Sequence, residues 1–157
     1  MLTVLFATRD RAQILREVLE TYCDVRPPAA GWKLVIVDNA SSDETREIVA
    51  SFARRLPVTL LFEREPGKNR ALNAGLGSLE GQLTVLTDDD AFPHPDWLVE
   101  LEKAAKAADF KQARKEGHEL PGLSEWNIRW VGEKGYQGIV ARQLQEFKRL
   151  QKEKEKG

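Results

Sequence analysis

Three consecutive carboxylates at residues 88–90 follow an apolar run over residues 83–87 and precede Pro93 and Pro95. A short run of apolar and β-branched residues is typical of a strand that is buried on both faces of a sheet. Prolines cannot continue such a strand, so it must end at the carboxylates. Adjacent negative charges repel one another, and a bound divalent cation commonly offsets the repulsion. The segment therefore predicts a cation site at a strand end, or else a solvated acidic turn before a helix.

The rest of residues 1–108 alternates apolar runs with segments of helical periodicity. Strands are expected over residues 2–7, 33–38, 58–62 and 83–87, and helices over residues 14–22, 44–54, 71–79 and 95–108. Ser41 or Ser42 is the expected N-cap of the second helix, and Pro95 suits the first position of the last one. Gly75 and Gly77 predict close packing or an early end of the third helix. The alternation favours an α/β fold with a mainly parallel sheet and helices on both faces.

Polar loops follow each of the four expected strands, at residues 8–11, 38–42, 63–70 and 88–90. In an open parallel sheet, ligands bind at the carboxyl ends of the strands. We therefore expect these four loops to form one site, although they lie far apart in the sequence.

This rim would combine carboxylates with cations, which suits a metal ion bound together with a polyphosphate. Mg2+ and Mn2+ take oxygen ligands and often link carboxylates to phosphate oxygens, so Asp88 and Asp90 are candidate metal ligands. Asp38 could accept hydrogen bonds from a base or ribose, or it could stabilise its own loop through an Asx turn. The candidates for phosphate binding are Arg9, Arg11, Lys68 and Arg70, and each of these could instead be a solvated surface charge.

Length and composition limit which kinds of protein the chain can be. A chain of 157 residues predicts one domain, and a net charge of -1 gives no case for binding nucleic acid. The charge is uneven, with a net of -5 over residues 1–110 and +4 over residues 111–157. A single cysteine, Cys23, excludes an intramolecular disulfide. No apolar stretch approaches the roughly 20 residues of a membrane span, which predicts a cytoplasmic protein without a transmembrane segment, with peripheral membrane contact left open.

Residues 4–11, 34–45, 67–75 and 87–98 form four segments that together resemble the motifs of family 2 glycosyltransferases. The first segment, residues 4–11, is similar to the family's first strand with its Thr-x-Asn-Arg loop, and the second, residues 34–45, to the segment after its second strand. The third, residues 67–75, is similar to the loop and helix that end in Asn-x-Gly, and the fourth, residues 87–98, to the metal-binding Asp-x-Asp segment. Arg9 and Asp10 depart from the usual Tyr and Asn of the first loop. The resemblance implies a GT-A fold, a nucleoside diphosphate sugar donor, and Mg2+ or Mn2+ on the diphosphate.

The resemblance also implies a role for each matching residue. Thr8, Arg9 and Asp89 would lie by the nucleotide sugar, Asp38 would read the base, Lys68 or Arg70 would approach the ribose or diphosphate, and Asp88 and Asp90 would flank the metal. In the family the metal neutralises the leaving diphosphate, and a second carboxylate deprotonates the acceptor hydroxyl for an inverting displacement. Glu133 is the candidate for this base, from a loose similarity of residues 122–125 and 132–134 to family segments. The alternative is that Glu133 is an ordinary surface glutamate in a Gly-rich turn, and because the similarity is only loose, this alternative is favoured over a catalytic base.

Two regions are expected on this basis. Residues 1–108 would form the nucleotide-sugar-binding α/β core, and residues 109–157 a shortened, basic, mostly helical segment that packs on the same domain. The expected function is sugar transfer to a saccharide, a lipid-linked or another hydroxyl acceptor. Two alternatives stay open: a truncated, non-catalytic nucleotide-sugar-binding module, and a sugar-phosphate nucleotidyltransferase. The absence of a Gly-rich, Arg-containing loop after the first strand counts against the latter.

Overall fold

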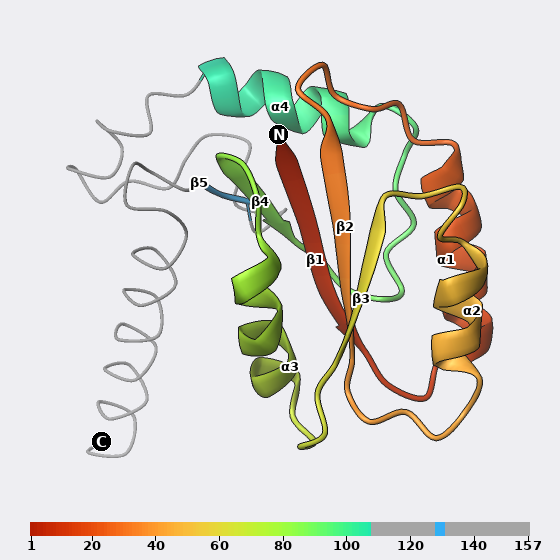
Figure 1. Cartoon of the computed structure of the whole chain (residues 1–157). Coiled ribbons are helices and arrows are strands. Elements are labelled where there is room, and N and C mark those ends of the chain that lie inside the picture. Colours follow the sequence, from red (N-terminus) through yellow and green to blue (C-terminus); the bar gives the residue numbers. More distant parts are fainter. Residues whose placement is uncertain (108–127, 131–157) are drawn as a thin grey trace, which may run out of the picture.

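A five-stranded sheet organises the described residues (Figure 1). The computed structural model describes residues 1–107 and 128–130. The strands are β1 (Leu2–Thr8), β2 (Trp32–Asp38), β3 (Val58–Phe62), β4 (Leu83–Leu86) and β5 (Ile128–Trp130), in the spatial order β3-β2-β1-β4-β5. The first four strands are parallel to their neighbours, and β5 is antiparallel to β4. The prediction of a mainly parallel α/β sheet is confirmed.

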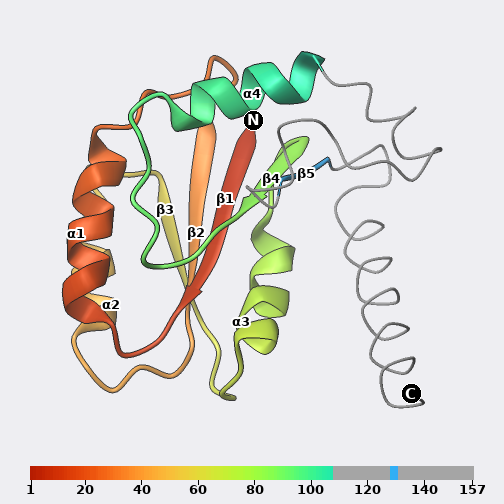
Figure 2. The same cartoon turned by 180° about the vertical axis from the view of Figure 1, so that it is seen from behind.

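Helices cover both faces of this sheet (Figures 1 and 2). The helices α1 (Ala12–Cys23), α2 (Thr45–Ser51) and α4 (Trp97–Ala107) share one apolar cluster with the sheet. The opposite face is covered by α3 (Lys68–Gly75), which continues into the 3-10 turn η1 (Leu76–Ser78). None of the helices in the described ranges combines the length and apolar composition that crossing a membrane requires.

The two cores follow from the alternation of side chains along each strand. Phe6 and Ile36 point toward α1 and α2, whereas their neighbours Leu5 and Val37 point toward α3. All four side chains are fully buried. Because both faces of the central strands are covered, these strands read in the sequence as continuous apolar runs.

Helix boundaries differ from the sequence-based expectations more than strand boundaries do. The third strand has the expected ends, whereas α2 ends at Ser51 and α4 begins at Trp97, two residues after the proline expected to start it. Neither Ser41 nor Ser42 caps α2; Asp43 accepts the hydrogen bond of the Thr45 N–H instead. The serine hydroxyls bond to Asp10, so they are already engaged in the neighbouring loop.

The proposed division of the chain at residue 108 stays a prediction. Within residues 109–157, the structure describes only β5, which lies in the same sheet as β1 to β4. The expected helical character of this part lies outside the described residues.

Gly75, the last residue of α3, lies against the buried face of the sheet. A Cβ atom at this position would lie 2.5 Å from Leu5 Cδ1 and 3.2 Å from Val37 Cγ2. At Gly77, two residues further along, no atom would lie within 4 Å of an added Cβ. The expectation of close packing is therefore confirmed for Gly75.

We expect Gly75→Ala to lower the free energy of unfolding by about 1–3 kcal/mol, because the added methyl group overpacks the buried sheet face. Gly77→Ala is the matched control and should leave stability unchanged or slightly raised. Urea unfolding of both variants tests this, and equal effects of the two substitutions would contradict it.

Candidate functional site

The register of the sheet brings polar side chains to one level at its carboxyl end. Thr8 of β1 pairs with Asp38 of β2, which in turn pairs with Phe62 of β3. Residues that pair across neighbouring strands point to the same face of a sheet. Thr8, Asp38 and Phe62 therefore form a row along the carboxyl edge, on the side of α1 and α2.

Asp89 extends this row beyond β4. Its Oδ2 accepts a hydrogen bond of 2.9 Å from the Thr8 hydroxyl, and both side chains are buried. Arg11 Nη1 lies 3.4 Å from the other carboxylate oxygen of Asp89. A buried carboxylate is costly unless it is hydrogen-bonded and paired with a charge, and Asp89 meets both conditions. The middle residue of the acidic run is thus the one that is fixed to the sheet.

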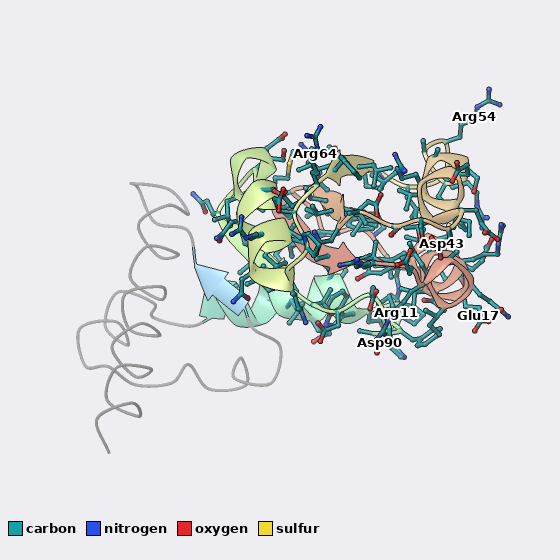
Figure 3. All side chains as sticks on the ribbon, turned by 90° about the horizontal axis from the view of Figure 1, so that it is seen from below. Arg11, Glu17, Asp43, Arg54, Arg64 and Asp90 are labelled. Carbon is teal, nitrogen blue, oxygen red and sulfur yellow. The ribbon has the colours of Figure 1, made fainter. Side chains whose placement is uncertain are left out.

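The two outer carboxylates of the run are exposed and point to different cations. Arg11 Nη1 lies 3.2 Å from Asp90 Oδ2, so its guanidinium bridges Asp89 and Asp90. Lys68, the first residue of α3, pairs with Asp88. Figure 3 looks onto the carboxyl end of the sheet and shows Arg11 beside Asp90, whereas Arg54 projects away from this group. The repulsion expected within the run is therefore offset here by basic side chains.

The carboxylate of Asp38 is completely buried, and only one of its two oxygens accepts a hydrogen bond within the described residues. Its Oδ1 accepts a hydrogen bond of 3.0 Å from the Ser41 N–H, so the aspartate does stabilise its own loop. Its Oδ2 receives no aligned hydrogen bond from any described residue. Arg46 Nε lies 3.2 Å from this oxygen as an ion pair, and the Arg46 guanidinium lies 5.1 Å from the centre of the exposed Phe62 ring. One buried carboxylate oxygen thus keeps acceptor capacity at the rim.

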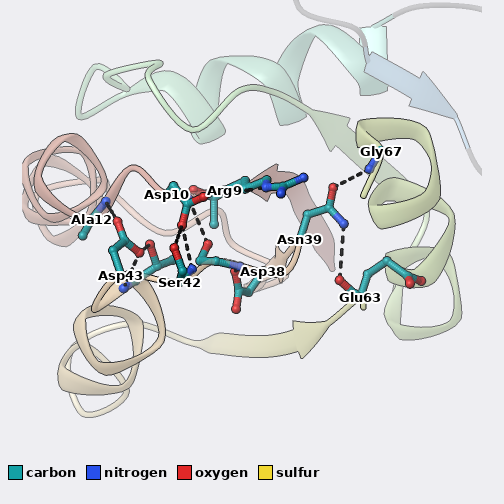
Figure 4. A network of polar contacts seen from close by, with 12 residues as sticks. Arg9, Asp10, Ala12, Asp38, Asn39, Ser42, Asp43, Glu63 and Gly67 are labelled. Carbon is teal, nitrogen blue, oxygen red and sulfur yellow. Dashed lines mark hydrogen bonds and ion pairs between the residues drawn. The ribbon is translucent and has the colours of Figure 1, made fainter. Parts of the chain in front are cut away.

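The loops after β1 and β2 are joined by two further aspartates (Figure 4). Asp10 Oδ1 accepts hydrogen bonds from the backbone and hydroxyl of Ser42. Asp43 accepts from the Ala12 N–H at the start of α1, and also from the backbone and hydroxyl of Thr45. Asp10 and Ala40 adopt positive φ angles of 48° and 60°, which non-glycine residues rarely do. This strain lies at the rim, where the surrounding bonds hold it in place.

These bonds lower the pKa of both aspartates. The backbone N–H of Ser42 is the main cause for Asp10, and the hydroxyl of Thr45 is the main cause for Asp43. Hydrogen bonds to a carboxylate favour its charged form. Both side chains are therefore ionised in the folded chain at neutral pH.

Asn39 joins the loop after β2 to the loop after β3 (Figure 4). Its side-chain amide donates to the carbonyl oxygens of Glu63 and Glu65, at 3.3 and 2.8 Å. Its side-chain oxygen accepts a hydrogen bond of 2.8 Å from the Gly67 N–H. The loop that leads to Lys68 and Arg70 is thereby held against the end of β2.

Three further candidate site residues are Arg9, Arg70 and Glu133, and the structure describes the first two. Arg9 is exposed, and its Nε lies 3.7 Å from Asp10 Oδ2. Arg70 is exposed and forms no ion pair with a carboxylate in residues 1–107. Glu133, the candidate base, lies outside the described residues. The structure therefore places the candidate residues for nucleotide and metal binding that lie in residues 1–107 on loops at the carboxyl end of the sheet, and Glu133 stays a prediction.

Sequence reasoning assigned no role to Arg46 or Asn39. Arg46 lies eight residues after Asp38, and its ion pair depends on how α2 returns over the strand end. Asn39 stands within a segment that resembles the family, but its partners lie 24 to 28 residues away. The only sequence signal was an asparagine directly after a buried strand, where an amide requires hydrogen-bonding partners.

A metal site formed by protein ligands alone is absent from the described ranges. Within residues 1–107 and 128–130, no three acidic, histidine or cysteine side chains gather closely enough to hold an ion. The oxygen donors of residues 88–90 do fit a hard cation that takes its remaining ligands from a phosphate and water. Arg11 and Lys68 already provide positive charge at these carboxylates, as a bound cation would.

The family model described as Glycosyl transferase family 2 matches residues 3–150. Among curated proteins, dolichyl-phosphate beta-glucosyltransferase ALG5A of Trichomonas vaginalis is 33% identical over 78 residues, and glycosyltransferase AglE of Haloferax volcanii is 26% identical over 98 residues. The alignments cover 48% and 61% of this chain, but 24% and 32% of those proteins. The chain thus spans about a quarter to a third of the length of these curated relatives.

Solved structures give a similar result. Mannosyltransferase PcManGT from Pyrobaculum calidifontis, in complex with GDP-Man and Mn2+, has a TM-score of 0.59 and 34% identity, and the match covers 67% of this chain and 31% of that one. S. aureus TarS 1-349 has a TM-score of 0.63 and 20% identity, covering 69% of this chain and 33% of that one. At 20% identity, the similarity to TarS is evidence for the fold alone. This fold is the GT-A arrangement expected from the sequence.

We expect Asp43→Asn to destabilise the fold by about 1 kcal/mol at pH 7, because an amide oxygen cannot replace all hydrogen bonds that the carboxylate accepts at two helix starts. The pKa of Asp43 is lowered on folding, so its stabilisation is present above the pKa of the unfolded chain and is lost as pH falls through the lower folded pKa. The difference between wild type and variant should therefore shrink as the pH is lowered from 7 to about 3.

Urea unfolding across this pH range measures the effect. Glu44→Gln is the control, because the neighbouring Glu44 side chain makes no capping hydrogen bond. A difference between wild type and Asp43→Asn that does not change with pH would contradict the interpretation.

Proposed function

The chain belongs to glycosyl transferase family 2, and from this membership we propose that it transfers a sugar from a nucleoside diphosphate sugar to a hydroxyl group of an acceptor. The observation that carries the proposal is the rim at the carboxyl end of the sheet. There Asp38 and the run at residues 88–90 lie on the same edge as Lys68 and other cations. Carboxylates with basic side chains suit a metal-bound diphosphate, whereas either group alone would not.

Asp38 is proposed to bind the nucleoside part of the donor. Its Oδ2 is buried and lacks an aligned hydrogen bond within the described chain, so a base or ribose donor would satisfy it. Thr8, Arg9 and Asp89 lie along the same edge and would flank the nucleotide. The similarity to a mannosyltransferase solved with GDP-Man supports a nucleotide-sugar ligand for this edge.

Lys68 and Arg70 are proposed to bind the diphosphate. Both are exposed on the first turn of α3, and Arg70 has no carboxylate partner within residues 1–107. A guanidinium can make two parallel hydrogen bonds to one phosphate group. Release of Lys68 from Asp88 would leave two cations facing the negative charge of the donor.

Asp88 and Asp90 are proposed to hold Mg2+ or Mn2+ together with the diphosphate. When bound, such an ion neutralises charge on the departing diphosphate. Asp89 keeps the acidic run in place through its hydrogen bond to Thr8, so its neighbours present their carboxylates to the rim. Arg11 must leave Asp90 for a cation to bind there, which makes its guanidinium available to the phosphate groups.

The acceptor side of the proposal rests on the family resemblance. We propose that residues 1–108 form the donor-binding core and that residues 109–157 complete it, with Glu133 as the base that takes the proton of the acceptor hydroxyl. Direct attack by that hydroxyl on the opposite face from the leaving group would invert the configuration of the sugar. The acceptor would be a saccharide or a lipid-linked hydroxyl compound.

A second candidate is a nucleotide-sugar-binding module without transfer activity. Binding alone would require only the proposed donor-site residues, which all lie within residues 8–90. Turnover of a nucleotide sugar, including slow hydrolysis, separates the two candidates. Transfer or hydrolysis supports the enzyme, whereas binding without any turnover supports the module.

We expect calorimetric titration of the 157-residue chain with UDP and GDP to detect binding that is stronger with Mn2+ than without it. Asp90→Ala should remove the effect of Mn2+, because it deletes an exposed carboxylate proposed to hold the ion. Glu44→Gln, which removes a surface carboxylate away from the acidic run, is the control and should keep the effect. No binding by a folded wild-type chain would contradict the proposed function, and unchanged Mn2+ dependence of Asp90→Ala would contradict the metal assignment.

We expect Asp38→Asn to weaken nucleotide binding about tenfold or more while the dependence on Mn2+ is retained, because a charged acceptor for the nucleoside is lost. The same titration measures this. Asp43→Asn changes another aspartate of the same loop and serves as the control for loop disruption. Unaltered affinity of Asp38→Asn would mean that this carboxylate acts only in its loop.

A further inference from the structure

We infer that Asn39 is a positioning residue that fixes the loop bearing Lys68 and Arg70 in its binding geometry. The inference rests on the proposed donor site and assigns a role to a side chain that does not itself face the ligand. Asn39 is almost fully buried, directly after Asp38 at the end of β2. It acts through the backbone of residues 63–67.

The contacts of Asn39 use all the hydrogen-bonding groups that an amide offers. Two N–H groups point to the carbonyl oxygens of Glu63 and Glu65, and the oxygen faces the Gly67 N–H. An aspartate could only accept, and a leucine could do neither. The loop therefore requires an amide at this position for all three bonds to form.

The backbone of Asn39 is tied to the sheet. Its backbone N–H donates a bond of 2.8 Å to the Thr8 carbonyl oxygen, which ties it to β1. The Glu63 N–H donates a bond of 2.9 Å to the Asp38 carbonyl oxygen, just beyond the pairing of β2 with β3. Asn39 thus fixes the position of the loop relative to β1 and β2.

Besides Asn39, the loop is held by a hydrogen bond from the Glu65 N–H to the Glu63 carboxylate and by the exposed ion pair of Lys68 with Asp88, not by buried side chains. Residues 64–70 are all exposed, so none of them contributes a buried apolar contact. Gly67 has a φ angle of 140°, which favours glycine, and its carbonyl accepts the first hydrogen bond of α3 from the Ala71 N–H. Because Lys68 follows Gly67 directly, the bond from Gly67 to Asn39 determines where α3 begins and where its basic side chains project.

Binding groups act best when their support holds them in place before the ligand arrives. If Asn39 were truncated, Lys68 and Arg70 would remain in the chain, but they would have to be ordered during binding. The loss of affinity should then depend on the presence of those two side chains. A general structural defect would not show this dependence.

The test is a double-mutant cycle on the full chain, measured by titration with UDP or GDP in Mn2+, whichever wild type binds more tightly. Asn39→Ala should weaken binding about tenfold in the wild-type background. Asn39→Ala should then be combined with Lys68→Ala and, separately, with Arg70→Ala. In at least one of these two backgrounds, Asn39→Ala should weaken binding by less than about twofold. Asn39→Asp, which keeps the acceptor for Gly67 but loses both donated bonds, replaces Asn39→Ala if the latter does not fold.

Thr3→Val is the matched control. Thr3 is buried at the opposite end of the sheet and bonds through its hydroxyl to both the N–H and the carbonyl of Glu80. Like Asn39→Ala, the Thr3→Val variant loses hydrogen bonds from a side chain to the backbone of a loop, but this loop lies away from the rim. Nucleotide affinity should therefore be retained. Amide hydrogen exchange at Gly67 should accelerate in Asn39→Ala and stay unchanged in Thr3→Val.

The outcomes separate the inference from the function on which it rests. An Asn39→Ala variant with wild-type affinity, or an equal loss in every background, would overturn the positioning role while leaving the donor site intact. A wild-type chain that binds neither nucleotide would instead overturn the proposed function, and the inference with it.

Discussion

The parallel pairing of β1 with β2 is the constraint on which the site depends. Seven consecutive residue pairs, from Leu2 with Trp32 to Thr8 with Asp38, bring both strands to an end at the same level. Both strands are largely buried over these residues, and the carboxylate of Asp38 lies where the ladder stops. A slip by one residue would turn Asp38 toward α3, away from Arg46 on α2.

Beyond the ladder, side chains replace backbone pairing as the means of holding the chain. Asp10 and Asp43 join the loops after β1 and β2, Asn39 joins the loops after β2 and β3, and Thr8 holds Asp89 after β4. Each of these bonds links segments that are far apart in the sequence. The rim is therefore arranged before any ligand binds, although it consists of loops.

The sheet, and the edge at which the candidate residues gather, could be predicted from the sequence because both depend on local patterns. Apolar runs marked the strands, and β3 has the expected bounds. Helix ends were less accurate, since Asp43 rather than a serine satisfies the start of α2. The roles of Arg46 and Asn39 could not be predicted, because they depend on side-chain contacts between segments whose relative placement no local pattern gives. The pairing of Asp88 with Lys68 is of the same kind.

The antiparallel strand β5 has a consequence for dividing the protein. Its residues pair with Leu83, Thr84 and Val85, so β4 is an internal strand with neighbours on both sides. A fragment cut at residue 108 would contain every donor-site candidate but would leave one side of β4 without a partner. Open strand edges pair readily with other chains, so such a fragment would tend to self-associate. The three residues of β5 therefore cover the otherwise open side of the strand that precedes the acidic run.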